Sequence, residues 1–122
     1  TTLAESLGEE SISGTSRLGQ KCFIMPNPGR YRITGELKSN TDGNDIIIEI
    51  GIPGVGNYIK ASAEYKTSST SYGEFSIDMT LPVSPYGLVS VVGYSNSSGK
   101  SGKIRNVRIK GVPGTADVAK VV

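Results

Sequence analysis

The sequence predicts an all-β protein, an antiparallel and jelly-roll-like β-sandwich of about eight strands that occupies residues 1–122 as one domain. Apolar and polar residues alternate with a period of two over most of the chain, as in strands with one buried and one wet face. Clusters of Gly, Pro, Asn and Ser interrupt these runs at short intervals. Helical periodicity is nearly absent, so two packed sheets are predicted.

In the first half of the chain, the strand pattern is weak in the early segments and strong from residue 31 on. Short runs near residues 8–13 and 18–25 predict two strands with little alternation. The segment YRITGELK (31–38) alternates strictly and places Tyr, Ile, Gly and Leu on one face. In DIIIEIGI (45–52), isoleucine at every second position makes one face wholly apolar. These apolar faces are the predicted core side of the strands.

The second half repeats the pattern. YIKASAEY (58–65) and FSIDMTL (75–81) alternate in the same way, and each predicts a strand. Two more strands are expected near residues 87–94 and 103–111, on either side of the glycine- and serine-rich stretch SNSSGKSG (95–102). That stretch is the predicted hairpin before the last strand.

The last strand contains a phase error. In KIRNVRIKG (103–111), Val107 and Ile109 alternate properly, but Ile104 is out of phase with them. One extra residue at Arg105-Asn106 restores the phase, and an extra residue in one strand is a β-bulge. A bulge is therefore predicted at this point.

The two ends lack a strong strand pattern. We expect a core over residues 8–111, an N-terminal arm over 1–7 and a C-terminal arm over 115–122. The sequence TADVAKVV of the C-terminal arm fits a short helix, a strand exchanged with a neighbouring copy, or a frayed tail. Its apolar residues favour an oligomer contact. The residues expected to make that contact are Asp117, Val118, Val121 and Val122.

The composition argues against catalysis and against bound cofactors. The chain contains no histidine and one cysteine, so no internal disulfide can form. Without histidine, the Ser-His-Asp and Cys-His arrangements and the common zinc sites are excluded. Carboxylates that could in principle hydrolyse glycosides all fall at the polar phase of strands, where solvated charges normally lie. They are Glu36, Glu49, Glu64, Glu74 and Asp78. We therefore expect no enzyme and no cofactor.

Charge and hydropathy argue against two classes of partner. The formal net charge is only +2, which favours neither nucleic acid nor an acidic membrane surface as a partner. No apolar run approaches the roughly 20 residues that span a bilayer. The chain begins Thr1-Thr2 without methionine, so it is expected to be processed or cut from a longer protein.

Two motifs resemble ligand loops and fail the test of spacing. Gly99-Lys100-Ser101 looks like the end of a phosphate-binding P-loop, but five residues rather than four separate Gly93 from Gly99, and a strand pattern follows where a helix is required. In NTDGND (40–45), the EF-hand position that needs a glutamate is occupied by Pro53. A looser calcium site remains an alternative there to a simple Asp-Gly turn.

The basic and aromatic residues each admit two interpretations. The cations Lys100, Lys103, Arg105, Arg108 and Lys110 form a run that fits the protection of an edge strand, or the binding of an anionic partner. Tyrosines near strand ends can cap the core, stack on sugars or enter a subunit interface. The predicted recognition loops are represented by Tyr58, Tyr72, Tyr86 and Asn96.

Three segments together resemble a β-sandwich module of tailed-phage and prophage virion proteins. The segments are KCFIMPNPGRYRITGELKS, YKTSSTSYGEFSIDMTLPV and SGKIRNVRIKG, and the resemblance spans about residues 10–111. The matching positions are Pro26, Gly29, Tyr31, Arg32, Glu36, Leu37, Lys38, Thr70, Tyr72, Phe75, Asp78, Arg105, Asn106, Arg108 and Ile109. The proline-rich PVSPYG (82–87) departs from that pattern.

The resemblance implies a non-enzymatic structural or adhesive module of a virion, such as a tail or capsid decoration component. It implies a homo-oligomer, trimeric or larger, other virion proteins as partners, and the virion as the location. A host-surface glycan is a further candidate partner. The alternatives are a carbohydrate-binding module and a secreted filament subunit whose terminal arm adds a strand to the next copy.

Overall fold

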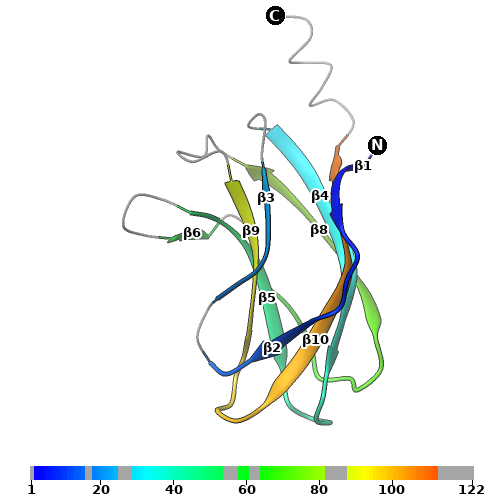
Figure 1. Cartoon of the computed structure of the whole chain (residues 1–122), viewed down its shortest axis with the longest axis vertical. Coiled ribbons are helices and arrows are strands. Elements are labelled where there is room, and N and C mark those ends of the chain that lie inside the picture. The colour runs from blue at the N-terminus through cyan, green and yellow to red at the C-terminus, as the bar shows by residue number, and fades with distance from the viewer. Residues whose placement is uncertain are drawn as a thin grey trace, which may run out of the picture.

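In the computed structural model of the chain, residues 2–15, 18–24, 29–53, 58–60, 64–81 and 88–112 are described. Within these ranges the chain forms ten strands in two five-stranded antiparallel sheets that face each other (Figure 1). The predicted antiparallel β-sandwich is therefore confirmed. No helix of the described residues has the length and hydropathy of a membrane span.

The first sheet has the order β1-β10-β4-β8, and β2 also pairs with β10. Its strands are β1 (Thr2–Ser6), β2 (Glu10–Ser13), β4 (Gly29–Ser39), β8 (Gly73–Leu81) and β10 (Ser101–Gly111). Both β1 and β2 lie on the same side of β10: β2 pairs with residues 101–104 and β1 with residues 107–110. The last strand is consequently central, with partners on both sides.

The second sheet has the order β3-β9-β5-β6, and β7 also pairs with β5. Its strands are β3 (Leu18–Ile24), β5 (Ile46–Pro53), β6 (Tyr58–Lys60), β7 (Tyr65–Thr67) and β9 (Leu88–Ser95). The chain changes sheets six times, from β2 to β3, β3 to β4, β4 to β5, β7 to β8, β8 to β9 and β9 to β10. Repeated crossing of this kind is what the jelly-roll-like prediction requires.

Two predicted boundaries differ from the structure. Residues 2–6, expected to form an arm, are strand β1, which pairs with the end of β10. Among the described side chains of this strand, Ala4 packs against the core as a partly buried residue. The stretch 58–65, expected as one strand, contains β6 and the first residue of β7 instead.

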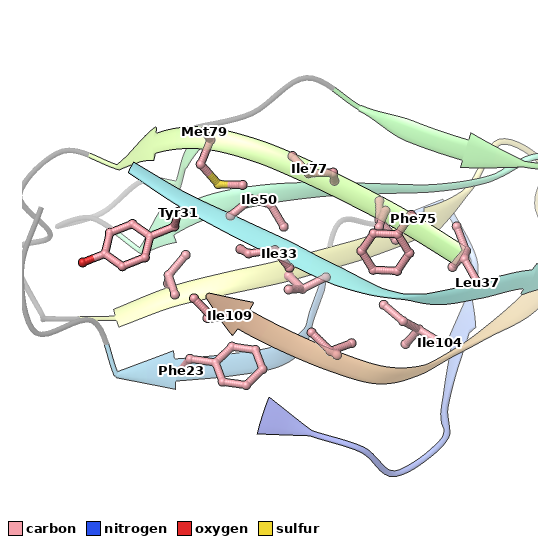
Figure 2. Close-up of a cluster of buried hydrophobic side chains, with 14 of the residues drawn as sticks. Phe23, Tyr31, Ile33, Leu37, Ile50, Phe75, Ile77, Met79, Ile104 and Ile109 are labelled. Atoms are coloured by element: carbon pink, nitrogen blue, oxygen red, sulfur yellow. The ribbon is translucent and has the colours of Figure 1, made fainter. Parts of the chain in front are cut away.

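The core lies between the sheets and consists of the apolar faces that the alternation predicts (Figure 2). The four isoleucines of β5 at positions 46, 48, 50 and 52 are almost completely buried. They face the apolar side chains of β4, β8 and β10. Gly35 of β4 leaves room for the Phe75 ring, since a Cβ atom at position 35 would lie 2.7 Å from two of its carbons.

The predicted bulge in β10 is present. Arg105 pairs with Glu36 and Arg108 pairs with Thr34, so three steps on β10 match two steps on β4. The extra residue is Asn106, whose φ of 56° lies in the left-handed region that asparagine tolerates better than most side chains. Because of this insertion, Ile104 and Val107 both point into the core.

The turn over residues 96–100 is not the predicted hairpin. Strand β9 belongs to the second sheet and β10 to the first, so this turn carries the chain across the sandwich. Gly99 has a φ of +77°, and the Lys100 N–H donates to the Ser97 carbonyl at 3.3 Å. A tight glycine turn was therefore expected correctly, but turn chemistry does not reveal whether the next strand joins the same sheet.

Candidate functional site

The outer face of the first sheet carries a polar cleft. Three neighbouring strands, β10, β4 and β8, turn their polar positions to this side. The cleft has a volume of about 460 Å³. It is lined by Thr34, Gly35, Glu36, Glu74, Phe75, Ser76, Asn106, Arg108 and Lys110. The pairing places Thr34 opposite Ser76 on one side and opposite Arg108 on the other, so these three residues form one row across the cleft.

The bulge brings the Asn106 side chain to this face. The Asn106 Nδ2 donates to Glu36 Oε1, and Arg105 Nη2 donates to Glu36 Oε2 at 3.1 Å. The backbone N–H of Asn106 donates to the Leu7 carbonyl at 3.2 Å. These bonds, that from Asn106 first and that from Arg105 second, lower the pKa of the Glu36 carboxyl. Glu36 is thereby held in one orientation as a carboxylate.

The replacement Glu36→Gln tests this arrangement through pH. A carboxyl whose pKa is lowered on folding stabilises the protein above its ordinary value of 4.5 and loses that contribution as pH falls through the lowered pKa. We expect the wild type to exceed Glu36→Gln in unfolding free energy at pH 7, and the excess to shrink below pH 4.5. Urea unfolding between pH 7 and pH 3 measures this difference. With Arg105→Gln as background the excess should be smaller; an excess that is the same at both ends of the range would refute the account.

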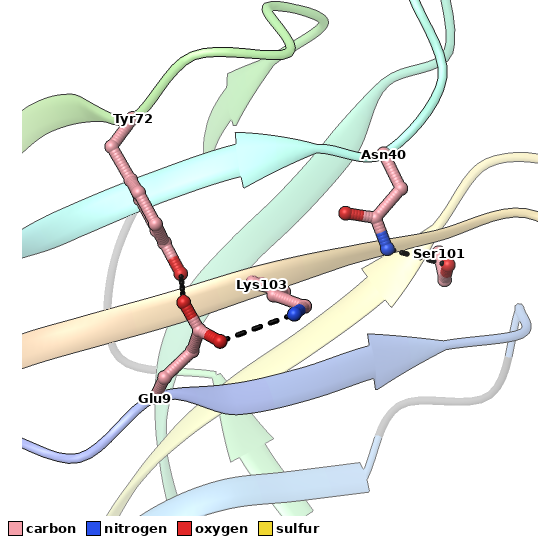
Figure 3. A network of polar contacts seen from close by, with 5 residues as sticks. All are labelled: Glu9, Asn40, Tyr72, Ser101 and Lys103. Atoms are coloured by element: carbon pink, nitrogen blue, oxygen red, sulfur yellow. Dashed lines mark hydrogen bonds and ion pairs between the residues drawn. The ribbon is translucent and has the colours of Figure 1, made fainter.

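Tyr72, a predicted recognition residue, is part of a network beside the cleft (Figure 3). Its hydroxyl donates to Glu9 Oε2 at 2.6 Å, and Lys103 Nζ donates to Glu9 Oε1 at 3.1 Å. The Arg105 guanidinium lies 3.8 Å from the centre of the Tyr72 ring, and Lys38 Nζ lies 5.2 Å from it. Burial first, and then the hydrogen bond to Glu9, raise the pKa of the Tyr72 phenol. The ring is thus engaged within the fold.

Of the other predicted recognition and contact residues, one is described and does not line the cleft, and the rest fall outside the described side chains. Asn96 is exposed in the turn after β9, where its N–H donates to the Asp45 carbonyl at 3.2 Å. The predictions that fall outside the described side chains are Tyr58, Tyr86, Asp117, Val118, Val121 and Val122. Tyr94, another tyrosine near a strand end, is only 8% exposed and donates to Glu64 at 2.9 Å. It cannot offer a free ring face to a sugar.

Edge-strand protection, one interpretation of the basic run, is wrong. The run belongs mostly to β10, and β10 is central. Its cations project from the outer face, where Lys103 pairs with Glu9 at 3.1 Å and Arg108 with Glu5 at 3.3 Å. Cations on a central strand do nothing to protect an edge, and three of them pair with carboxylates of the same chain. The binding of an anionic partner, the other interpretation, stays a prediction.

Two further site predictions are corrected or narrowed. Glu49, expected to be solvated, is fully buried, because both faces of β5 are covered in the folded chain. In the turn considered for calcium, the amide of Asn44 is buried and donates to Ser95 Oγ at 3.1 Å, which ties this side chain to the end of β9. The described residues contain no group of three His, Cys, Asp or Glu side chains that could hold a metal ion.

Comparison of sequences finds no match for the chain, whereas comparison of folds finds similar solved structures. No protein-family model and no curated protein matches it. A CBM4 structure is similar with a TM-score of 0.61 at 13% identity, over 84% of this chain and 70% of that one. The C-terminal domain of EclA, a sugar-binding protein, has a TM-score of 0.53 at 13% identity, over 86% and 79%. A family 16 carbohydrate binding module has a TM-score of 0.50 at 18% identity, over 82% of this chain and 74% of that one.

At such identities the likeness establishes the β-sandwich fold. It also overturns the predicted function as a structural or adhesive virion module, since the similar folds belong to carbohydrate-binding and sugar-binding proteins and not to virion proteins. The predicted homo-oligomer and virion partners gain no support from these structures. The resemblance of the sequence to phage modules has no family match to test it and stays a prediction.

Proposed function

We propose that this chain is a carbohydrate-binding module without catalytic activity, and that its binding surface is the cleft on the outer face of the first sheet. The observation that carries the proposal is the chemistry of that cleft. It gathers carboxylates, hydroxyls, an amide and cations from three neighbouring strands. Sugar hydroxyls donate and accept hydrogen bonds, so a surface with both kinds of group in fixed positions suits them. The likeness of the fold to sugar-binding proteins supports the same function.

The available acceptor in the cleft is Glu74. Within the part of the chain that the structure describes, its carboxylate makes no ion pair and no hydrogen bond, and its side chain is exposed. Ser76, two residues along β8, and Thr34 across from it add hydroxyls on the same face. Because all three stand on strands inside a sheet, their positions are set before a ligand arrives, which reduces the entropy lost on binding.

The binding mode we propose relies on hydrogen bonds more than on ring stacking. The chain has no tryptophan, and the Tyr72 ring is faced by the Arg105 guanidinium. A sugar would therefore meet the polar floor of the cleft and the edge of this network. Affinity should be modest, since hydrogen bonds to a ligand replace hydrogen bonds to water.

The geometry of Glu36 supports a role without catalysis. A glycosidase needs one carboxylic acid whose pKa is raised so that it can protonate the leaving group. The bonds from Asn106 and Arg105 lower the pKa of Glu36 instead, which keeps it ionised. No histidine can replace it as the acid.

The replacement Glu74→Ala tests the proposed site. A glycan array identifies a ligand for the wild type, and titration calorimetry then compares variants with that ligand. We expect Glu74→Ala to weaken binding by about 10-fold, the value of one hydrogen bond to a charged group. Asp42→Ala removes an exposed carboxylate from the turn between β4 and β5 and should leave binding unchanged. If no glycan binds, or if both variants weaken binding equally, the proposed site is wrong.

A further inference from the structure

The cations of the cleft stand on one wall, and its carboxylates stand on the middle strand and on the other wall. On β10, Arg108 and Lys110 stand two residues apart and so project from the same face. On β8, Glu74 occupies the opposite wall. Between them, Thr34 of β4 contributes a neutral hydroxyl to the floor. A ligand in the cleft would meet cations along one side and a carboxylate along the other.

The cations of the β10 wall have donors to spare. Arg108 uses Nε to donate to Glu5 Oε2 at 3.3 Å, on the side that faces β1. Its two terminal nitrogens and the ammonium of Lys110 make no hydrogen bond or ion pair within the described chain. The Arg108 side chain is 39% exposed, so these donors can reach a ligand.

Neighbouring strands leave this positive charge incompletely balanced. Lys110 lies directly opposite Arg32 on β4, and like charges opposite each other destabilise a sheet. Arg32 is neutralised by Asp78, to which it donates at 2.7 and 3.0 Å. Glu36 is engaged by Arg105 and Asn106 and is not free to turn toward Lys110. With Arg32 neutralised by Asp78, the Lys110 ammonium is left without a carboxylate partner in the described chain, and an anion from outside could balance its charge.

We propose that the ligand is an acidic glycan, in which a sugar carboxylate binds Arg108 and Lys110 while sugar hydroxyls donate to Glu74. This inference rests on the proposed function and names the class of its ligand. A planar carboxylate matches the paired terminal N–H groups of a guanidinium, which favours a uronic acid unit. A continuous polyanion such as nucleic acid suits the cleft poorly, because the carboxylate of Glu74 stands on the opposite wall.

Matched pairs of ligands test the proposal without altering the protein. The probes are short oligomers of galacturonate, glucuronate and mannuronate, each compared with its methyl ester, in which the sugar is kept and the charge is removed. The full chain is titrated with each by calorimetry at low salt. We expect at least one acid to bind, with its ester at least about 10-fold weaker. Raising the salt concentration should weaken the binding of the acid and leave the binding of the ester unchanged.

Variants then locate the charge. Arg108→Gln and Lys110→Gln should each weaken the acid by about 10-fold and have little effect on the ester. Arg108→Lys keeps the positive charge but loses the paired N–H donors of the guanidinium. Its affinity for the acid should therefore fall between those of the wild type and Arg108→Gln. Lys100→Gln removes an exposed cation from the turn before β10 and serves as the control. Thermal unfolding of each variant verifies that it is folded.

The outcomes separate this inference from the proposed function. If neutral glycans or esters bind as tightly as the acids, the inference is overturned and carbohydrate binding stands. If sulfated oligosaccharides bind through Arg108 while uronates do not, the assignment of a carboxylate is overturned. If no sugar binds at all, both proposals fall.

Discussion

Replacing Gly102 by alanine is expected to destabilise the protein by roughly 3 kcal/mol, the scale of overpacking that the backbone cannot relieve. A Cβ atom at this position of β10 would collide with the Lys38 carbonyl oxygen of β4 and would lie 2.5 Å from Ile46 Cγ1. The carbonyl belongs to the backbone of the neighbouring strand, so it cannot turn aside as a side chain could. Relief requires β10 and β4 to separate where Gly102 pairs with Ser39.

Gly73→Ala provides the matched control for this prediction. Gly73 begins β8 in the same sheet, and a Cβ atom there would meet nothing within 4 Å. Chemical denaturation of both variants should show a much lower midpoint for Gly102→Ala and a midpoint close to wild type for Gly73→Ala. Similar midpoints would show that β10 and β4 are not packed as closely as described.

The second large effect is expected from Lys21→Met. Lys21 of β3 is only 4% exposed, and its ammonium donates to the Gly8 carbonyl at 2.6 Å and to Ser6 Oγ at 2.9 Å. Glu10 Oε1 lies 3.4 Å away. One buried cation of the second sheet thus fixes the segment that joins β1 to β2 in the first. Methionine keeps the apolar stem and removes the charge, and we expect a loss of about 2–3 kcal/mol.

Lys103→Met makes the same chemical change at an exposed ion pair. Lys103 and its partner Glu9 have side chains 36% and 43% exposed. Exposed pairs contribute little, so this variant should lose only a small fraction of what Lys21→Met loses. Urea unfolding of both variants gives the comparison. Equal losses would mean that Lys21 acts as an ordinary surface charge.

Alternation along the strongly patterned strands predicted which residues face the core. Strict alternation around Ile33 indicates a strand with one buried face, and Ile33 is completely buried. Ile48, on the wholly apolar face of β5, is completely buried too, although the other face of that strand is also covered. The bulge followed from the same argument, because burying both Ile104 and Val107 requires one extra residue between them. Predictions of this kind depend only on residues a few positions apart in one strand, so the sequence alone is enough to make them.

The lateral order of the strands could not be predicted in this way. Nothing local to residues 101–111 tells that this strand is central, so its cations fit an edge equally well. The cleft depends on that order, because it exists only where β10, β4 and β8 lie side by side. Its lining of Thr34, Ser76 and Asn106 is also ordinary for a strand surface. Tyrosine rings near strand ends can stack on sugars, which made them candidates for a binding site, but Tyr94 is buried.

The central position of β10 also constrains how the protein folds. Strands β1, β2 and β4 all pair with β10, a strand that lies more than 60 residues after them in the chain. Such non-local pairing gives a high contact order, for which two-state domains fold in milliseconds to seconds rather than microseconds. A fragment that ends before Ser101 lacks one wall of the cleft and the partner of both N-terminal strands. The sugar-binding surface we propose is therefore complete only after residues 101–111 have joined the sheet.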